Sequence, residues 1–219
     1  MSKYEVEYID EEHIYLINGV ITKSVTQILH LLFPDKYKNV DINILSAKAK
    51  YGTELHNYIE QYENGIITQE INYIQEISFK QYLKLKEKHN IEVIEQEKII
   101  NYKDVYAGRF DMIAKVNNEL CLCDIKTTAQ LDLEYLSWQL SLYEFAYGKK
   151  FDKLYAIWLP KKDLGKLVEV KRKSKKEIKE LLERLNGWKY GINYNKYFIN
   201  DYNYGLIMCK CKRLWKTWI

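Results

Sequence analysis

The stretch VYAGRFDMIAKVNNELCLCDIK, residues 105–126, decides the fold of this chain. Apolar residues dominate both of its halves, Val105–Ala114 and Glu119–Lys126, as is typical of strands inside a sheet. Asn117 and Asn118 lie between the halves, and asparagine tolerates the left-handed backbone that a tight hairpin turn requires. The stretch therefore predicts two neighbouring antiparallel strands.

Three of the charged side chains on this predicted hairpin should lie close together. Alternation places Asp124 and Lys126 on one face of the second strand, and the hairpin brings Asp111 of the first strand close to them. Ionised groups within a sheet are costly unless something compensates them. A hard divalent cation compensates two carboxylates and a phosphate compensates a lysine, so the pattern predicts metal-dependent cleavage of a phosphodiester. The alternative interpretation is a surface ion pair at a polar strand end.

Further polar residues lie on predicted helices before and after the hairpin. His56 and Glu60 are four residues apart in a predicted helix over residues 42–62, and Gln139 and Tyr143 are four apart in another over 133–147. Each pair alone also fits an ordinary amphipathic helix. Gly108, three residues before Asp111, permits a bulge or the close approach of another backbone.

Taken in chain order, these residues form a series of five motifs: Gly52-x-x-x-His56, Glu97, Gly108-x-x-Asp111, Asp124-x-Lys126-Thr127 and Gln139-x-x-x-Tyr143. The series resembles the RecB-like nucleases of the PD-(D/E)XK superfamily, including their bacteriophage and prophage exonucleases, over about residues 51–147. Order and spacing make the resemblance specific, because each motif alone is weak. It implies an α/β fold with a mixed central β-sheet flanked by helices, built on a restriction-endonuclease-like αβββαβ core.

The resemblance also implies a set of metal ligands. Asp111 and Asp124 would be the central ligands, with the backbone carbonyl of Ile125 as a further oxygen. His56 would be the additional ligand typical of this branch, and Glu97 would line the site or bind the metal through water. Oxygen ligands suit Mg²⁺, and one imidazole should make Mn²⁺ a good substitute.

The remaining motif residues would act on the substrate. By the same resemblance, Lys126 would contact the scissile phosphate or the attacking water, and Gln139 and Tyr143 would flank the site. The two nearby carboxylates should keep Lys126 charged, so we expect it to act as an electrostatic stabiliser. Glu95 lies two residues from Glu97 on the same predicted strand face and could take its place.

These residues together predict a Mg²⁺-dependent deoxyribonuclease, acting as an exonuclease on double-stranded DNA ends in phage recombination. The resemblance implies DNA as the substrate, a single-strand annealing protein as a partner and a homo-oligomer. A structure-specific or sequence-specific endonuclease of the same fold is one alternative. A DNA-binding module without turnover is another.

Composition sets the broader class. The 219 residues fit a single nuclease domain, with an N-terminal hairpin and helix (1–40), a catalytic core (42–172) and a basic helical C-terminal extension (173–219). Residues 149–189 hold 14 Lys/Arg against 6 Asp/Glu, which favours a phosphate-backbone partner, although a solvated helix face is the simpler interpretation. The sequence has no membrane-length apolar run and no signal-peptide pattern, so we expect a cytoplasmic protein of a bacterial host cell.

The spacing of the cysteines is compatible with a second, different metal site. Cys121-x-Cys123 and Cys209-x-Cys211 could in principle hold zinc or an iron–sulfur cluster. Cys121 and Cys123 lie on a predicted core strand, however, where cysteine behaves as a small hydrophobic residue. We therefore expect no cysteine-bound metal.

Local signals outline the other elements. A hairpin is expected over residues 4–21 with its turn at Asn18-Gly19, and a capping box at Ser24 predicts a helix that ends before Pro34. Ser174 and Glu177 form a second capping box. The other elements are expected as helices over 71–88 and 174–190 and strands over 91–100, 153–159 and 166–171.

Overall fold

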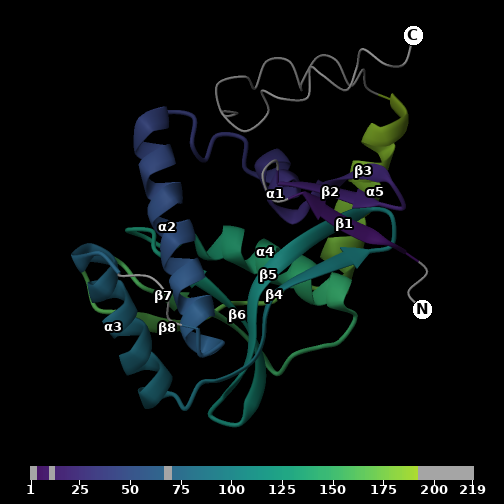
Figure 1. The fold of residues 1–219 in the computed structure, drawn as a ribbon. Helices are drawn as coiled ribbons and strands as arrows, with labels where there is room; N and C mark the ends of the chain where they lie inside the picture. The colour runs from purple at the N-terminus through teal and green to yellow at the C-terminus, as the bar shows by residue number, and fades with distance from the viewer. Residues whose placement is uncertain (1–3, 10–12, 67–70, 192–219) are drawn as a thin grey trace.

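The computed structural model describes residues 4–9, 13–66 and 71–191 (Figure 1). Within them the helices are α1 (Val25–Leu32), α2 (Ile42–Glu63), α3 (Tyr73–Lys88), α4 (Leu133–Tyr147) and α5 (Lys175–Gly191). The strands are β1 (Val6–Ile9), β2 (Ile14–Ile17), β3 (Val20–Ser24), β4 (Glu92–Tyr102), β5 (Tyr106–Val116), β6 (Glu119–Lys126), β7 (Lys153–Trp158) and β8 (Lys166–Glu169). Every helix and strand expected from residue 24 to residue 190 is present.

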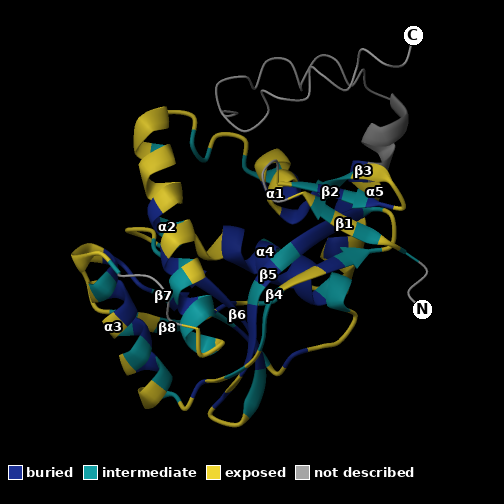
Figure 2. Ribbon diagram, in the orientation of Figure 1, coloured by how far each residue is buried: buried dark blue, intermediate teal, exposed yellow. Residues whose placement is uncertain are grey.

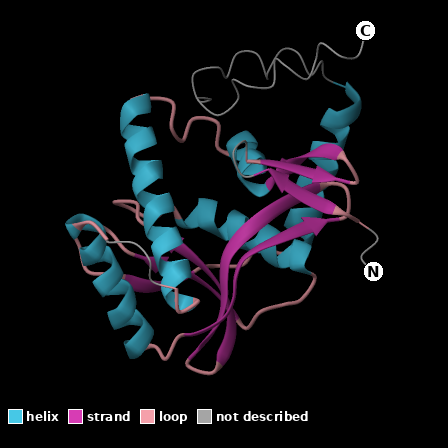
Figure 3. Ribbon diagram, viewed as in Figure 1, coloured by secondary structure: helices cyan, strands magenta, loops and turns pink. Residues whose placement is uncertain are grey.

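The strands form one mixed eight-stranded sheet in the order β1-β2-β3-β5-β6-β7-β8, and β4 pairs with the other edge of β5. The β3–β5 and β6–β7 pairs are parallel, and the remaining pairs are antiparallel. Helices α1, α4 and α5 pack against one face, and α2 and α3 pack against the other (Figure 3). The order α2, β4-β5-β6, α4, β7 reproduces the predicted αβββαβ core and confirms the mixed α/β fold.

The predicted central hairpin is β5-β6. Its strands pair from Met112↔Cys123 to Val116↔Glu119. Asn117 and Asn118 form the turn with φ values of 48° and 69°, the left-handed conformation that asparagine tolerates better than most residues. A short polar turn therefore fixes the register that places Asp111 opposite Asp124, one pair beyond the ladder.

The N-terminal region differs from its prediction. A two-stranded hairpin is expected over residues 4–21, but the structure has three strands, and the Asn18-Gly19 turn joins β2 to β3. Strand β3 then pairs in parallel with the start of β5, through Lys23↔Tyr106 and Ser24↔Ala107. The N-terminal strands are therefore part of the same sheet as the core.

One edge of β5 is shared by two strands, and this creates a fork. Strand β3 pairs with its first two residues, and β6 pairs with it only from Met112 onward. Between these points, residues 108–111 have β4 on one side and no ladder partner on the other. Side chains from both helical layers converge on this fork, which is where the predicted site residues lie.

The core consists of a cluster on each face of the sheet. Leu122 and Leu140 are fully buried in the cluster beneath α1, α4 and α5, and Leu55 and Ile59 are fully buried beneath α2 and α3. Cys121 and Cys123 lie in the second cluster and are free and buried, as expected for hydrophobic core residues. The buried residues of α2 all lie from Tyr51 onward, and residues 42–50 project from the body (Figure 2).

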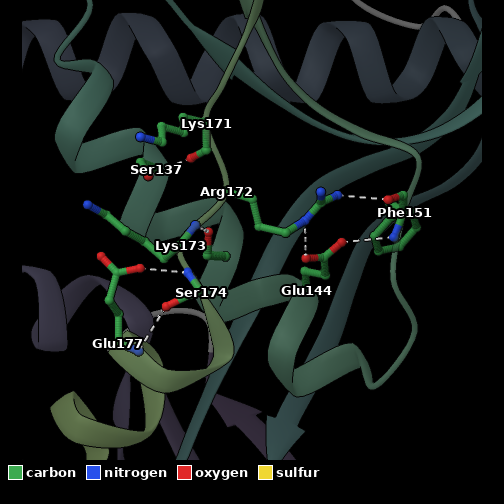
Figure 4. Close-up of polar contacts among 9 residues, drawn as sticks. Ser137, Glu144, Phe151, Lys171, Arg172, Lys173, Ser174 and Glu177 are labelled. Carbon is green, nitrogen blue, oxygen red and sulfur yellow. Dashed lines mark hydrogen bonds and ion pairs between the residues drawn. The ribbon is translucent and has the colours of Figure 1, made fainter.

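A partly buried ion pair between Glu144 and Arg172 connects α4 to the segment that leads into α5 (Figure 4). Glu144 accepts hydrogen bonds from the Phe151 backbone N–H at 2.8 Å and from Arg172 Nε at 2.6 Å. Arg172 also donates to the Phe151 carbonyl at 2.7 Å, and Ser141 Oγ accepts from the Lys173 backbone N–H at 2.8 Å. These bonds hold residues 171–173 along α4 and so fix where α5 begins.

Replacing Glu144 with alanine should lower the free energy of unfolding by about 3 kcal/mol. The change leaves the Arg172 guanidinium and the Phe151 N–H without their acceptor, and breaking a buried ion pair typically costs this much. Urea unfolding followed by circular dichroism measures the loss. Glu134→Ala is the matched control. The side chain of Glu134, which forms an ion pair with Lys173, is 59% exposed, so this pair should contribute less than about 1 kcal/mol. Equal losses in the two variants would contradict the expectation.

The C-terminal extension is described only in part. Ser174 and Glu177 form the predicted capping box, with backbone to side-chain bonds of 2.7 and 3.2 Å. Helix α5 follows to Gly191, and residues 192–219, with Cys209 and Cys211, lie outside the described part of the chain. Among the described residues, no helix combines the length and apolar character needed to cross a membrane.

Candidate metal centre

Three of the predicted ligands meet at the fork in β5. His56 of α2, Glu97 of β4 and Asp111 of β5 each offer a ligand atom, and these atoms all lie within 4.8 Å of one another. All three side chains are partly buried. One imidazole nitrogen and two carboxylate oxygens at this spacing fit the donor set of Mg²⁺ or Mn²⁺.

Helix α2 lies against the end of β6 at the turn that carries His56. Gly52 lies one turn before it, where an added Cβ would stand 3.4 Å from Thr127 Oγ1. His56 Nδ1 lies 3.6 Å from Asp111 Oδ2, and its Nε2 lies 3.1 Å from the carbonyl oxygen of Ile125. The imidazole therefore touches two of the groups that the resemblance implies as ligands.

The backbone of Ile125 also orients the central aspartate. Its N–H donates to Asp111 Oδ2 at 2.6 Å, while its carbonyl faces His56. The backbone of one residue thus contacts both a carboxylate and an imidazole. Its carbonyl lies where the predicted backbone ligand should be, and its role as a ligand stays a prediction.

Glu97 is the acidic residue of β4 that reaches the centre, and Glu95 is not. Pairing of Gln96 with Met112 and of Lys98 with Phe110 places Glu97 opposite Asp111. Glu95 instead forms an ion pair with Lys98. The ladder shifts register between Val93 and Glu95, and Glu97 has a φ of 47°, so strict alternation does not hold along this part of β4.

Binding of Mn²⁺ should weaken as the pH falls from about 8 to about 6. Burial, followed by the nearby carboxylate of Asp111, raises the pKa of Glu97 to about 8, although Arg109 opposes the shift. An ion must displace this proton, so affinity should fall by up to about tenfold per pH unit below that pKa. Isothermal titration calorimetry measures the dependence. Glu97→Gln has no such proton and should give weaker binding with a flatter pH profile; an unchanged profile in this variant would contradict the assignment.

Asp124 and Lys126 form an ion pair beside the group of three rather than joining it. The two side chains are 2% and 22% exposed. Burial raises the pKa of Asp124, and Lys126 opposes that effect. Burial lowers the pKa of Lys126, but the carboxylates of Asp124 and Asp111 together raise it by more than burial lowers it. The pKa therefore lies above its ordinary value and the amine is charged, as predicted. The role of Asp124 as a central metal ligand stays a prediction.

Gln139 and Tyr143 approach the fork from the other helical layer. Both are buried on α4, and Gln139 Nε2 donates to the Tyr143 hydroxyl at 3.5 Å. Gln139 Oε1 is buried and has no hydrogen-bond partner among the described residues. Burial, followed by the nearby carboxylate of Asp124, raises the pKa of Tyr143. Both residues therefore flank the acidic cluster, and Gln139 retains an acceptor for a further group.

Gly108 serves a different purpose from the predicted one. An added Cβ would lie 2.7 Å from Tyr143 Cε1 and 3.1 Å from Val25 Cγ2, so the close approach is by side chains and not by a backbone. The missing side chain lets the Tyr143 ring lie against β5 at the fork.

Gly108→Ala should destabilise the protein by about 1–3 kcal/mol and reduce any activity of the site, because Tyr143 must move away from the fork. Chemical denaturation gives the first quantity and turnover gives the second. Gly52→Ala is the control, since its Cβ would make an ordinary contact and alanine is favoured inside a helix. A fully stable and active Gly108→Ala variant would show that the ring position is unimportant.

Two residues near the site, Arg109 and Tyr37, were not predicted from the sequence. Arg109 Nε lies 2.9 Å from Glu97 Oε2, and its guanidinium lies 5.0 Å from the ring centre of Tyr8 on β1. Its position two residues before Asp111 on the same strand was the available signal. Tyr37, in the connection between α1 and α2, lies close enough to Lys126 to affect its pKa, and no local pattern indicated this.

Comparison with known proteins adds little to this geometry. No family model and no curated protein matches the chain. The solved structure named "Crystal structure of SSO0001" is similar with a TM-score of 0.43 and 18% sequence identity, over 87% of this chain and 86% of that chain. A likeness at this level supports neither a site nor an activity.

Proposed function

We propose that this protein is a divalent-metal-dependent DNA nuclease that acts on the ends of double-stranded DNA. The observation that carries the proposal is the convergence of His56, Glu97 and Asp111 within 4.8 Å, beside the buried Asp124 and its ion-pair partner Lys126. Acidic clusters are common on protein surfaces. Partly buried carboxylates from separate strands, joined by an imidazole and a lysine, are not explained by packing.

In this proposal the residues have different roles in phosphodiester cleavage. A divalent cation held by His56, Glu97 and Asp111 would offset the negative charge of the phosphodiester and assist attack by water. Lys126 would direct a second positive charge at the scissile phosphate, and Asp124 holds its ammonium in place. Gln139, with its buried free acceptor, would orient a water or a substrate hydroxyl beside Tyr143. A role in phage recombination with a single-strand annealing partner, and a homo-oligomeric state, are carried by the resemblance alone.

The test compares linear and closed-circular duplex DNA in the presence of Mg²⁺, Mn²⁺ or EDTA. We expect the linear duplex to be degraded with either metal, and both substrates to stay intact in EDTA. Cutting of the closed circle would favour the endonuclease alternative. Binding of DNA without cleavage in either metal would leave the non-catalytic module as the better description. Asp111→Asn protein prepared in the same way controls for contaminating nucleases.

A further inference from the structure

A row of three side chains leads from the site toward the edge of the sheet. Lys126 of β6 is the register partner of Trp158 on β7, and Trp158 is the partner of Lys166 on β8. Directly paired residues on adjacent strands project from the same face of a sheet. Trp158 is therefore the next side chain outward from the site lysine, and Lys166 is the one after it.

Trp158 lies where the buried face of β7 meets solvent. Leu154 and Ala156 project from the same face and are at most 1% exposed, whereas Trp158 is only half-buried. Its Nε1 donates to the carbonyl of Thr128 at 2.7 Å, and Lys166 Nζ lies 5.6 Å from its ring centre. The indole is thus held in one orientation at the rim rather than packed away in the core.

The chain segment that follows Trp158 carries more lysines than acidic residues. Lys161, Lys162 and Lys166 are exposed, and none of them has an ion-pair partner among the described residues. Lys161 Nζ instead lies 3.6 Å from the ring centre of Tyr51 on α2. Asp163 is the acidic residue between these lysines. An aromatic plane among such cations is complementary to a nucleotide, which offers a base and a phosphate at once.

We infer that Trp158 stacks on the base next to the scissile phosphate, and that Lys161 and Lys166 contact the neighbouring phosphates of the same single strand. The inference rests on the proposed function for its direction, because it places the scissile phosphate at Lys126. The strand then crosses the carboxyl ends of β6 and β7, and a duplex end must be unpaired locally to enter. A purely structural role, in which Trp158 only tethers Thr128, is the rival explanation.

Binding of a fluorescein-labelled 12-nucleotide single strand, measured in EDTA so that no cleavage occurs, tests the inference. Trp158→Leu should weaken binding about 10- to 100-fold, the usual effect of losing one stacked base. Trp158→Phe keeps a ring but loses the bond to Thr128, and it should stay within about threefold of wild type. Equal losses in the two variants would establish the tether and overturn the stacking role. Trp138→Leu, on α4, is the control for loss of a tryptophan elsewhere.

Two further readouts would not follow from a structural role. A strand that lacks one base should bind wild type more weakly when the abasic position is the stacked one. Binding to Trp158→Leu should not depend on whether that base is present. The double variant Lys161→Ala/Lys166→Ala should lower the slope of log affinity against log salt by about 1.4, or about 0.7 for each phosphate that a lysine no longer neutralises. An unchanged slope, or equal abasic sensitivity in wild type and Trp158→Leu, contradicts the inference.

The outcomes separate this inference from the nuclease proposal. If wild type cleaves linear DNA but Trp158→Leu binds the strand as tightly as wild type, the stacking site is wrong and the nuclease proposal stands. If no DNA is cleaved but binding depends on Trp158 as described, the nuclease proposal is wrong and the strand-binding surface stands. Thermal unfolding of each variant confirms that it is folded.

Discussion

Asp111→Asn is expected to lower the rate of DNA cleavage by at least about a thousandfold and Mn²⁺ affinity by at least about a hundredfold. The carboxylate lies at the centre of the group, near His56 and opposite Asp124 across the hairpin. Asparagine has the same shape, and its amide oxygen can still accept the 2.6 Å bond from the Ile125 N–H, so the fold should survive. What is lost is the negative charge that a divalent cation requires.

The two quantities are measured by calorimetric titration with Mn²⁺ and by turnover of linear duplex DNA. Asp35→Asn is the control, because the side chain of Asp35 is 78% exposed on the α1–α2 connection and is not part of the acidic cluster. Both quantities should stay at wild-type values in that variant. Normal metal binding by Asp111→Asn would mean that the ion is held elsewhere.

Lys126→Met is expected to reduce cleavage about 100- to 1000-fold without weakening Mn²⁺ binding. This is the usual cost of removing one preorganised positive group from a developing negative charge. Removing the ammonium also removes repulsion toward a nearby cation, so metal affinity should stay the same or rise. The separation of the two effects distinguishes Lys126 from the metal ligands, whose loss should weaken both.

Stability of Lys126→Met should depend on pH more steeply than stability of the wild type. Burial already raises the pKa of Asp124, and loss of the opposing lysine raises it further. A carboxyl whose pKa is higher in the folded than in the unfolded state stabilises the fold at low pH, and that stability is lost as the pH rises through the folded pKa. Urea unfolding at about pH 5 and about pH 8 should therefore show a larger loss at the higher pH.

A paired variant tests the reason for that loss. Asp124→Asn/Lys126→Met removes both charges, and it should recover most of the stability at about pH 8 because no carboxylate is left buried alone. It should stay inactive in cleavage. If the double variant is as unstable at high pH as the single one, the pair contributes through packing and not through charge.

Local sequence signals were enough to predict most of the secondary structure. The Asn117-Asn118 turn needs only two residues that accept a left-handed backbone, and the capping boxes at Ser24 and Ser174 are completed by a side chain three residues later. Such signals act over a few residues and do not depend on the rest of the molecule. The strands and helices of the core, and the positions of the site residues on them, could therefore be predicted from the chain.

Long-range pairing decided what those elements build. Glu97, and not Glu95, reaches His56 and Asp111 because the β4–β5 register, with its shift after Val93, pairs Glu95 with Ile113 and places Glu97 opposite Asp111. No local pattern encodes that shift, since it depends on which strand lies alongside. The same holds for the pairing of β3 with β5, which joins the N-terminal strands to the central sheet and leaves the fork beside β6.

The sequence by itself determined where the chain turns, where its helices begin and which residues are candidates for a functional site. Only the tertiary structure decided that Tyr143 lies against Gly108, that Arg109 pairs with Glu97 and that Trp158 stands next to Lys126. The physical reason is that turns and caps are set by backbone geometry within about four residues. Contacts across the sheet are set by the packing of apolar faces from distant segments, which fixes strand register only when the whole core forms.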